Sequence, residues 1–177
     1  MDGSGIASDK WFDKSGIDLH GVVTNGATVE NAPSGDTGLI HKTGTYAYTM
    51  VGSSSGNWTI RSGYEYLAYT RIGNMCHIQG KLETTSDSAG SGELRISLPF
   101  TSATLPDTSD WMLMGLKLYN VTGASGLDNM VAVISPDNAH MTAYKISASG
   151  VDAEISNGDF SNNVIEGYIG GTYIVKE

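Results

Sequence analysis

This chain contains very little of several residue types that stabilise or direct other classes of protein. Its 177 residues include one cysteine, so no disulfide bond can form within the chain. Ten lysines and arginines stand against 19 aspartates and glutamates, which gives a formal charge of −9. Nucleic acids and anionic membrane surfaces are bound by clustered basic side chains, so this balance argues against both as partners.

Long apolar runs and helical patterns are also missing. No apolar segment approaches the length that spans a membrane, so we predict no membrane insertion. The N-terminus lacks the basic and apolar stretches of a classical secretory signal. No window repeats apolar residues at helical spacing, and 23 glycines beside only 16% charged residues indicate short strands and tight turns. We therefore predict an all-β fold.

The clearest pattern lies in residues 64–83. Residues 64–72 are rich in tyrosine and β-branched side chains, residues 75–83 alternate, and Gly73-Asn74 separates the two runs. This arrangement predicts a β-hairpin. The second run has an apolar and a polar face, formed by Cys76, Ile78 and Leu82 on one side and His77, Gln79, Lys81 and Glu83 on the other. A further strand follows, with Leu94, Ile96 and Leu98 inward and Pro99 at its end.

A family resemblance rests on this hairpin and the strand after it. Residues 69–74 read YTRIGN, and residues 98–102 read LPFTS. Together they resemble the C-terminal head domains of bacteriophage tail fibres and tailspikes, which commonly read YTKIGN and then LPFTS, so Arg71 replaces a lysine. Residues 170–175 resemble the closing strand of that family. The resemblance covers residues 57–177 and implies a jelly-roll-like antiparallel β-sandwich that assembles as a homotrimer.

The rest of this region continues the strand pattern. We expect further strands at residues 57–61, 111–119, 130–135, 140–147, 151–155 and 166–175, with Asn157-Gly158-Asp159 as a turn. Residues 111–119 are largely apolar on both faces, since Met112, Met114, Leu116 and Leu118 oppose Trp111, Leu113, Gly115, Lys117 and Tyr119. A strand of this kind lies centrally in a sheet or meets a second subunit.

Residues 1–56 differ from the rest of the chain. Their apolar islands, among them Trp11-Phe12, are separated by Gly, Asp, Ser and Asn, and no island can bury itself alone. We interpret residues 1–56 as an extended anchor or stem in which Trp11 and Phe12 contact another virion protein. A flexible leader is the alternative. Residues 57–177 then form the head domain.

The sequence carries no recognisable catalytic or metal-binding constellation. Residues 52–56 match the G-x-S-x-G pattern of a nucleophile elbow, but a strand pattern follows where a helix is required, so we interpret them as a linker. Cys76 lies on an apolar face, so we interpret it as a small core residue. Four histidines (His20, His41, His77 and His140) lie far apart in the sequence, and none has a partner at the spacing typical of metal ligands. Asp107 and Asp110 read as turn residues. We predict no enzyme activity, no metal and no cofactor.

Binding is the function that remains. Loops between strands carry recognition in such domains, and the candidate loops are residues 84–92, 102–110, 120–128 and 156–163. Sugars are held by aromatic faces together with fixed polar groups. The aromatic residues nearest these loops are Trp111, Tyr119, Tyr144 and Phe160, each of which could equally belong to the core.

These observations lead to one hypothesis and one alternative. The hypothesis is a phage fibre or receptor-binding protein, made in the bacterial host cytoplasm and built into the virion. Its N-terminal segment attaches to the particle, and its trimeric head binds a host-surface polysaccharide. The alternative is a capsid decoration or head-fibre protein with a stabilising or weakly adhesive role. A secreted carbohydrate-binding module is disfavoured because no signal sequence is recognised.

Overall fold

The computed structural model describes residues 10–11, 21–22, 40–85, 90–106, 111–122, 130–146, 152–160 and 164–176. The chain divides into two compact units, Met1–Gly38 and Leu39–Glu177. In the first unit, β1 (Lys10–Trp11) pairs antiparallel with β2 (Gly21–Val22). No helix among the described residues is long and apolar enough to cross a membrane.

The second unit is all-β, as the sequence predicts. Its described strands are β3 (His41–Ala47), β4 (Met50–Gly52), β5 (Asn57–Trp58), β6 (Tyr66–Ile72), β7 (Met75–Glu83), β8 (Leu94–Ser97), β9 (Met112–Leu118), β10 (Met130–Ile134), β11 (His140–Ile146), β12 (Asp152–Glu154) and β13 (Glu166–Ile174). Asn157–Asp159 forms one turn of 3-10 helix, η3. All pairings described between these strands are antiparallel.

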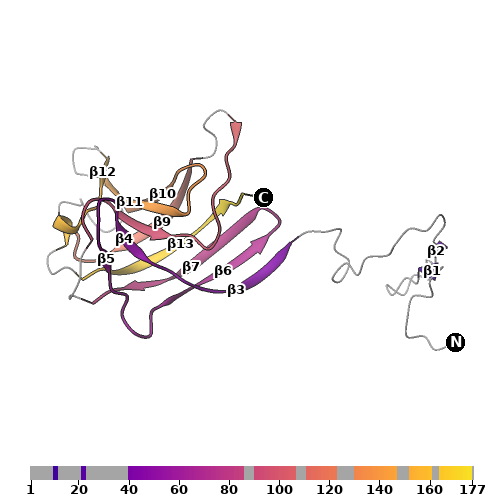
Figure 1. Cartoon of the computed structure of the whole chain (residues 1–177), viewed down its shortest axis with the longest axis horizontal. Coiled ribbons are helices and arrows are strands. Elements are labelled where there is room, and N and C mark those ends of the chain that lie inside the picture. Colours follow the sequence, from indigo (N-terminus) through magenta and orange to yellow (C-terminus); the bar gives the residue numbers. More distant parts are fainter. Residues whose placement is uncertain are drawn as a thin grey trace. The chain divides into compact units, whose positions relative to one another are not determined.

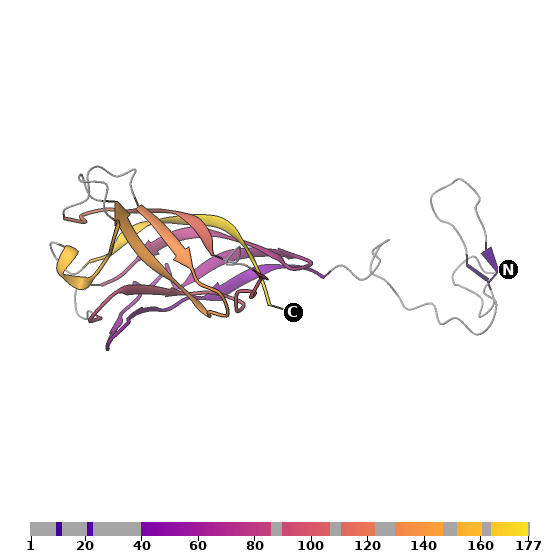
Figure 2. The ribbon, with the colours of Figure 1, turned by 90° about the horizontal axis from the view of Figure 1, so that it is seen from above.

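These strands form a single sheet that curls round its own inner face (Figures 1 and 2). Its order is β3-β6-β7-β13-β9-β10-β11-β8-β4-β5, with β12 beside β11. Only Tyr48 and Thr49 separate β3, at one end of this order, from β4, near the other end. The two ends must therefore lie close together, and an isolated bridge between Ile60 and Thr84 joins them further along. A curled antiparallel sheet is thus established, whereas the jelly-roll arrangement stays a prediction.

The core fills the inner face of the curled sheet. Strand alternation places every second side chain there. On β7 the predicted inward residues Cys76, Ile78 and Leu82 are all fully buried. The inward residues of β8 and β9 are also buried, at 5% exposure or less, and include Leu94, Ile96, Met114, Leu116 and Leu118. Full burial of one such aliphatic side chain contributes about 1.5–3 kcal/mol, so this face supplies most of the stability.

The hairpin predicted around Gly73-Asn74 is confirmed. β6 and β7 pair in register, with Ile72 opposite Met75 across the two-residue turn. Gly73 has φ +58°, a left-handed conformation that glycine adopts without a steric penalty. Its amide N–H donates to the carbonyl oxygen of Ile40 at 2.7 Å, which fixes the start of β3 against the turn.

Three features of the fold differ from the sequence interpretation. Residues 52–56 are not a linker, because they form the turn of the β4–β5 hairpin, closed by a Gly52 N–H bond to Gly56 O at 3.0 Å. β13 lies inside the sheet between β7 and β9. The strands also begin before residue 57, since β3 and β4 belong to the main sheet and the folded unit starts at Leu39.

The two sequence motifs that carry the family resemblance meet in space. Tyr69 and Arg71 lie on β6, and Phe100 follows β8. The Phe100 ring lies edge-on to the Tyr69 ring, with 5.4 Å between centroids. The Arg71 guanidinium carbon lies 5.0 Å from the Phe100 ring centroid, a cation–π distance. The two motifs therefore form one packing unit, although more than twenty residues separate them in the sequence.

Candidate binding face

The four aromatic residues selected from the sequence lie in different places. Phe160 is 5% exposed and packs in the core. Trp111 is 55% exposed and precedes β9, whereas Tyr119 follows β9. These two lie about 26 Å apart along the strand, at ~3.3 Å per residue, so they do not share one site. Tyr144 lies on β11, where its hydroxyl donates to Glu154 Oε1 at 3.3 Å.

A row of tyrosines and lysines crosses the outer face of the sheet. Lys81 on β7, Tyr168 on β13 and Lys117 on β9 are successive cross-strand partners. Because directly opposite residues point to the same face, these three side chains stand side by side. Tyr168 remains 49% exposed between the two lysines.

Two further tyrosines extend this row. The rings of Tyr119 and Tyr168 meet edge to face, with centroids 6.3 Å apart and planes at 81°. Lys117 Nζ lies 5.7 Å from the Tyr119 centroid, and Lys81 Nζ lies 4.8 Å from the Tyr64 centroid. Both are cation–π contacts. We call these five residues (Tyr64, Lys81, Tyr168, Lys117 and Tyr119) the tyrosine–lysine ladder.

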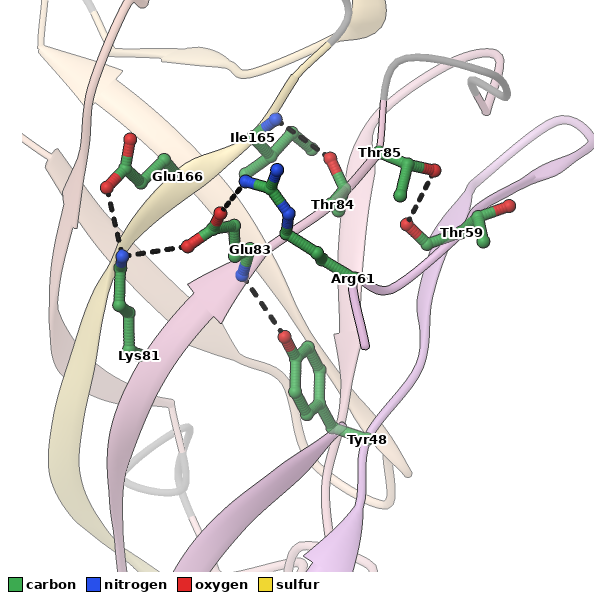
Figure 3. A network of polar contacts seen from close by, with 9 residues as sticks. All are labelled: Tyr48, Thr59, Arg61, Lys81, Glu83, Thr84, Thr85, Ile165 and Glu166. Atoms are coloured by element: carbon green, nitrogen blue, oxygen red, sulfur yellow. Dashed lines mark hydrogen bonds and ion pairs between the residues drawn. The ribbon is translucent and has the colours of Figure 1, made fainter. Parts of the chain in front are cut away.

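A charge network holds Lys81 in the ladder (Figure 3). Its ammonium group lies 2.7 Å from Glu83 Oε2 and 3.0 Å from Glu166 Oε1. Glu83 also pairs with the guanidinium group of Arg61. The carboxylate of Glu83 is only 8% exposed, so both of its oxygens have a cationic partner where water has little access.

These contacts fix the charge of the network. Hydrogen bonds from Lys81 and then Arg61 lower the pKa of Glu83, and bonds to Glu83 and Glu166 raise the pKa of Lys81. The sequence placed Glu83 on the polar outer face, yet the side chain is buried. Alternation along β7 is preserved, and the burial arises because Arg61 and Lys81 cover the carboxylate.

Backbone contacts attach the Arg61 segment to β7. The Arg61 amide N–H donates to Glu83 O at 2.9 Å, and the Thr85 amide N–H donates to Thr59 O at 2.9 Å. The buried Thr84 hydroxyl accepts the amide N–H of Ile165 at 2.9 Å, which ties the start of β13 to the same place (Figure 3). These hydrogen bonds therefore hold together the three segments that carry the network: residues 59–61, β7 with the two residues after it, and the start of β13.

Two glycines leave the sheet uncovered beside the ladder. Gly170 on β13 and Gly115 on β9 are cross-strand partners. On the outer face they are the pair next to Tyr168 and Lys117, two residues away along each strand. A Cβ atom at Gly170 would have no neighbour nearer than 3.9 Å, and one at Gly115 would meet only Gly170 O at 3.2 Å. We call this pair the glycine floor. Next along this row come Val131 and then Tyr144.

Other potentially reactive groups do not gather into a site. Among residues 40–176, gaps aside, no three His, Cys, Asp or Glu side chains come together as metal ligands. His77 Nδ1 lies 3.1 Å from Thr172 Oγ1. Cys76 is fully buried, and burial raises the pKa of its thiol, as expected of a core cysteine. Asp107 and Asp110, and parts of all four candidate loops, lie outside the described residues.

Sequence reasoning found Tyr119 but missed the other ladder residues as binding candidates. Lys81 and Tyr168 lie more than 80 positions apart, and only the strand order brings them together. The available signal was alternation in residues 166–174, which puts Tyr168 on a face with Gly170 and Thr172. No protein-family model matches this chain, and no curated protein sequence matches it either.

Proposed function

We propose that this chain is a bacteriophage fibre or receptor-binding protein whose β-rich head binds a host-surface glycan on the tyrosine–lysine ladder. The observation that carries the glycan-binding part is Tyr168, which stands exposed between two lysines in the middle of a sheet face. The phage assignment rests on the sequence motifs, and the contact of Tyr69 and Arg71 with Phe100 supports it because the motif residues form one unit.

The ladder has the composition of a saccharide site. Aromatic rings offer apolar faces against the C–H groups of a sugar, and fixed polar groups orient its hydroxyls. Lys81 is held by two carboxylates, so its position is set before a ligand arrives. A pre-positioned polar group loses less conformational entropy on binding, which favours affinity.

The charge network supports binding without hydrolysis. A glycosidase pairs two carboxyl groups, one of which needs a raised pKa to donate a proton. Here the two neighbouring carboxylates, Glu83 and Glu166, share the ammonium group of Lys81. The pKa of Glu83 is lowered, which suits a fixed anion and not a general acid.

A jelly-roll-like homotrimer anchored by its N-terminal segment completes the proposal. Trp111 is 55% exposed and Leu113 is 68% exposed at the start of β9. Large apolar side chains at this exposure are typical of contact surfaces, and this supports a subunit interface there. The N-terminal unit, residues 1–38, would attach the head to another virion protein.

Binding to an array of bacterial surface polysaccharides tests the glycan site. The full chain should bind at least one polysaccharide, and Tyr168→Ala should weaken that binding by about 30-fold, since an aromatic anchor is worth about 2 kcal/mol. Met75→Ala is the matched control, because Met75 is 53% exposed at the far end of a neighbouring strand. Equal binding by both variants would refute the ladder as the site.

The position of the protein on the particle tests the virion assignment. Immunogold labelling of intact phage particles should mark the tail fibres. Label on the capsid would favour the decoration protein instead, and its absence from particles would refute both forms of the proposal.

A further inference from the structure

Lys117 has no acidic partner in the part of the chain that the structure describes, although the chain is rich in acids. Five of the basic side chains in the main sheet form ion pairs, namely Arg61, Lys81, Arg95, Lys145 and Lys176. Lys117 stands beside its cross-strand partner Tyr168, and its ammonium group lies 5.7 Å from the Tyr119 ring centroid. Lys42 and Arg71 also form no ion pair among the described residues, but they lie on β3 and β6, so Lys117 is distinguished by its place beside the exposed Tyr168 ring.

The two lysines of the ladder differ in the charge they offer to a ligand. Lys81 is neutralised by Glu83 and Glu166 at 2.7 and 3.0 Å. Lys117, on the other side of Tyr168, forms no ion pair with any of the described acidic side chains. The Tyr168 ring is therefore flanked by a neutral ion-pair cluster on one side and a free ammonium group on the other.

From this asymmetry we propose that the ligand of the ladder is an acidic saccharide whose carboxylate binds Lys117. The inference rests on the proposed glycan-binding function and names the class of glycan. A sugar ring packs against Tyr168 and Tyr119, and its carboxylate reaches the Lys117 ammonium group. A charge-assisted hydrogen bond of this kind is worth more than a neutral one, so it selects a uronate over its uncharged counterpart.

The glycine floor gives such a ligand room next to Lys117. Side chains on one face of a strand recur about every 6.7 Å, so the missing side chain at Gly170 opens about 13 Å between Tyr168 and Thr172. Gly115 extends the opening to the strand that carries Lys117. A saccharide can thus contact the backbone surface there while its acid group lies beside the lysine.

An acidic saccharide fits the face better than an acidic peptide. An acidic peptide presents its carboxylates on flexible side chains, whereas a uronate carries its carboxylate on a ring that can pack against the exposed Tyr168. The hydroxyl groups of a uronate can also bond to Glu166, whose side chain is 42% exposed beside Lys81. The exposed tyrosine ring and the unpaired lysine together match a ligand that has both an apolar ring face and an acid group.

Isothermal titration calorimetry on the full chain tests the inference with matched pairs of probes. Polygalacturonate and alginate are each compared with their carboxyl-reduced forms, and poly-glutamate serves as a charged polymer without sugar. We expect an acidic form to bind about tenfold more tightly than its reduced form, from one charge-assisted bond. Lys117→Gln should abolish this preference, while Lys42→Gln, which removes an exposed charge on β3, should preserve it.

The other possible results of this experiment each contradict a specific claim. Equal affinity for acidic and reduced forms, or a preference that survives Lys117→Gln, overturns the acidic-ligand inference and leaves glycan binding standing. Poly-glutamate binding as tight as that of the uronates shows that charge alone is recognised and overturns the saccharide class. If neither the acidic nor the reduced forms bind, the acidic-ligand inference fails, and binding to the polysaccharide array decides whether the proposed glycan site stands. Thermal melting of each variant shows that the fold is retained.

Discussion

Glu83 and Glu166 face each other across strands β7 and β13, and the ammonium group of Lys81 binds both carboxylates. Like charges directly opposite on a sheet are normally destabilising. Lys81 removes this repulsion and brings its own side chain against Tyr64. One lysine thus stabilises the sheet and sets the geometry of the ladder.

Replacing this lysine should therefore lower stability. In Lys81→Met the two carboxylates remain opposite each other without their shared cation, and the buried Glu83 keeps only Arg61. Lys42→Met removes an exposed lysine of β3 and serves as the control. Thermal melts followed by circular dichroism should show a clearly lower Tm for Lys81→Met than for Lys42→Met. Equal Tm values would mean that the bridge contributes nothing to folding.

The same network predicts how stability depends on pH. The pKa of Glu83 is lowered in the folded chain by Lys81 and Arg61, relative to an ordinary glutamate value of about 4.3. As pH falls, the unfolded chain takes up this proton before the folded chain does. The contribution of Glu83 is therefore complete above about pH 4.3 and is lost as pH falls through the lowered pKa.

Urea denaturation at a series of pH values measures this effect. The free energy of unfolding of the wild type should decline on the acid side, and Glu83→Gln should decline less steeply there because it has no proton to gain. Parallel acid-side curves for the two proteins would contradict a lowered pKa at Glu83.

Much of the fold follows from local patterns in the sequence. Alternation in residues 75–83 identified the buried face of β7, and Gly73-Asn74 identified its turn. Such signals are read within a few residues because side chains alternate across a strand. The same reasoning placed β8, β9, β10 and β11 within one or two residues of their observed bounds.

The proposed binding face could not be found in the same way. Tyr168 becomes a ladder residue only because β13 lies between β7 and β9, and no local pattern fixes that order. Residues 41–52 were assigned to the N-terminal segment because β3 is exposed over most of its length and therefore lacks an alternating apolar signal. Burial of Glu83 depended on Arg61, which lies 22 residues away.

The β4–β5 turn gives a stability prediction that is independent of the ladder. A Cβ atom at Gly52 would lie 2.3 Å from the backbone nitrogen and oxygen of Ser91, so Gly52→Ala must displace backbone. We expect a loss of about 1–3 kcal/mol in urea denaturation. Gly158→Ala, whose nearest neighbour would be Ser156 Oγ at 3.9 Å, should stay within about 0.5 kcal/mol of wild type. Similar losses for both would refute the packing argument.

Assembly is the next prediction. If Trp111 and Leu113 lie at a subunit interface, the purified chain should show a trimer mass in light scattering at micromolar concentration. Changing both to glutamate places charges in that interface and should lower the mass to that of a monomer. A wild-type monomer would exclude the trimer. If the variant remains trimeric, the subunit interface does not include the start of β9.

The last prediction separates the N-terminal segment from the sheet. Deleting residues 1–38 removes no strand of the main sheet, so the remaining chain should still unfold cooperatively. Deleting residues 1–52 removes β3 and β4 together with Tyr48 and Met50, which are 3% and 0% exposed. Truncating one buried methionine already costs about 2–5 kcal/mol, against a total stability of about 5–15 kcal/mol, so this shorter chain should not fold.

The same deletions test the proposed attachment to a phage particle. Phage lacking residues 1–38 of this protein should fail to incorporate the folded head, and Trp11→Ala with Phe12→Ala should weaken incorporation, since aromatic anchors are worth about 2 kcal/mol each. Trp11 lies in β1, while Phe12 lies outside the described residues. Quantitative blotting of purified particles gives the incorporated amount. If the double variant is incorporated normally while the deletion is not, the N-terminal segment still attaches the head, but residues other than Trp11 and Phe12 make the contact. Normal incorporation of both would show that the main sheet itself makes the attachment.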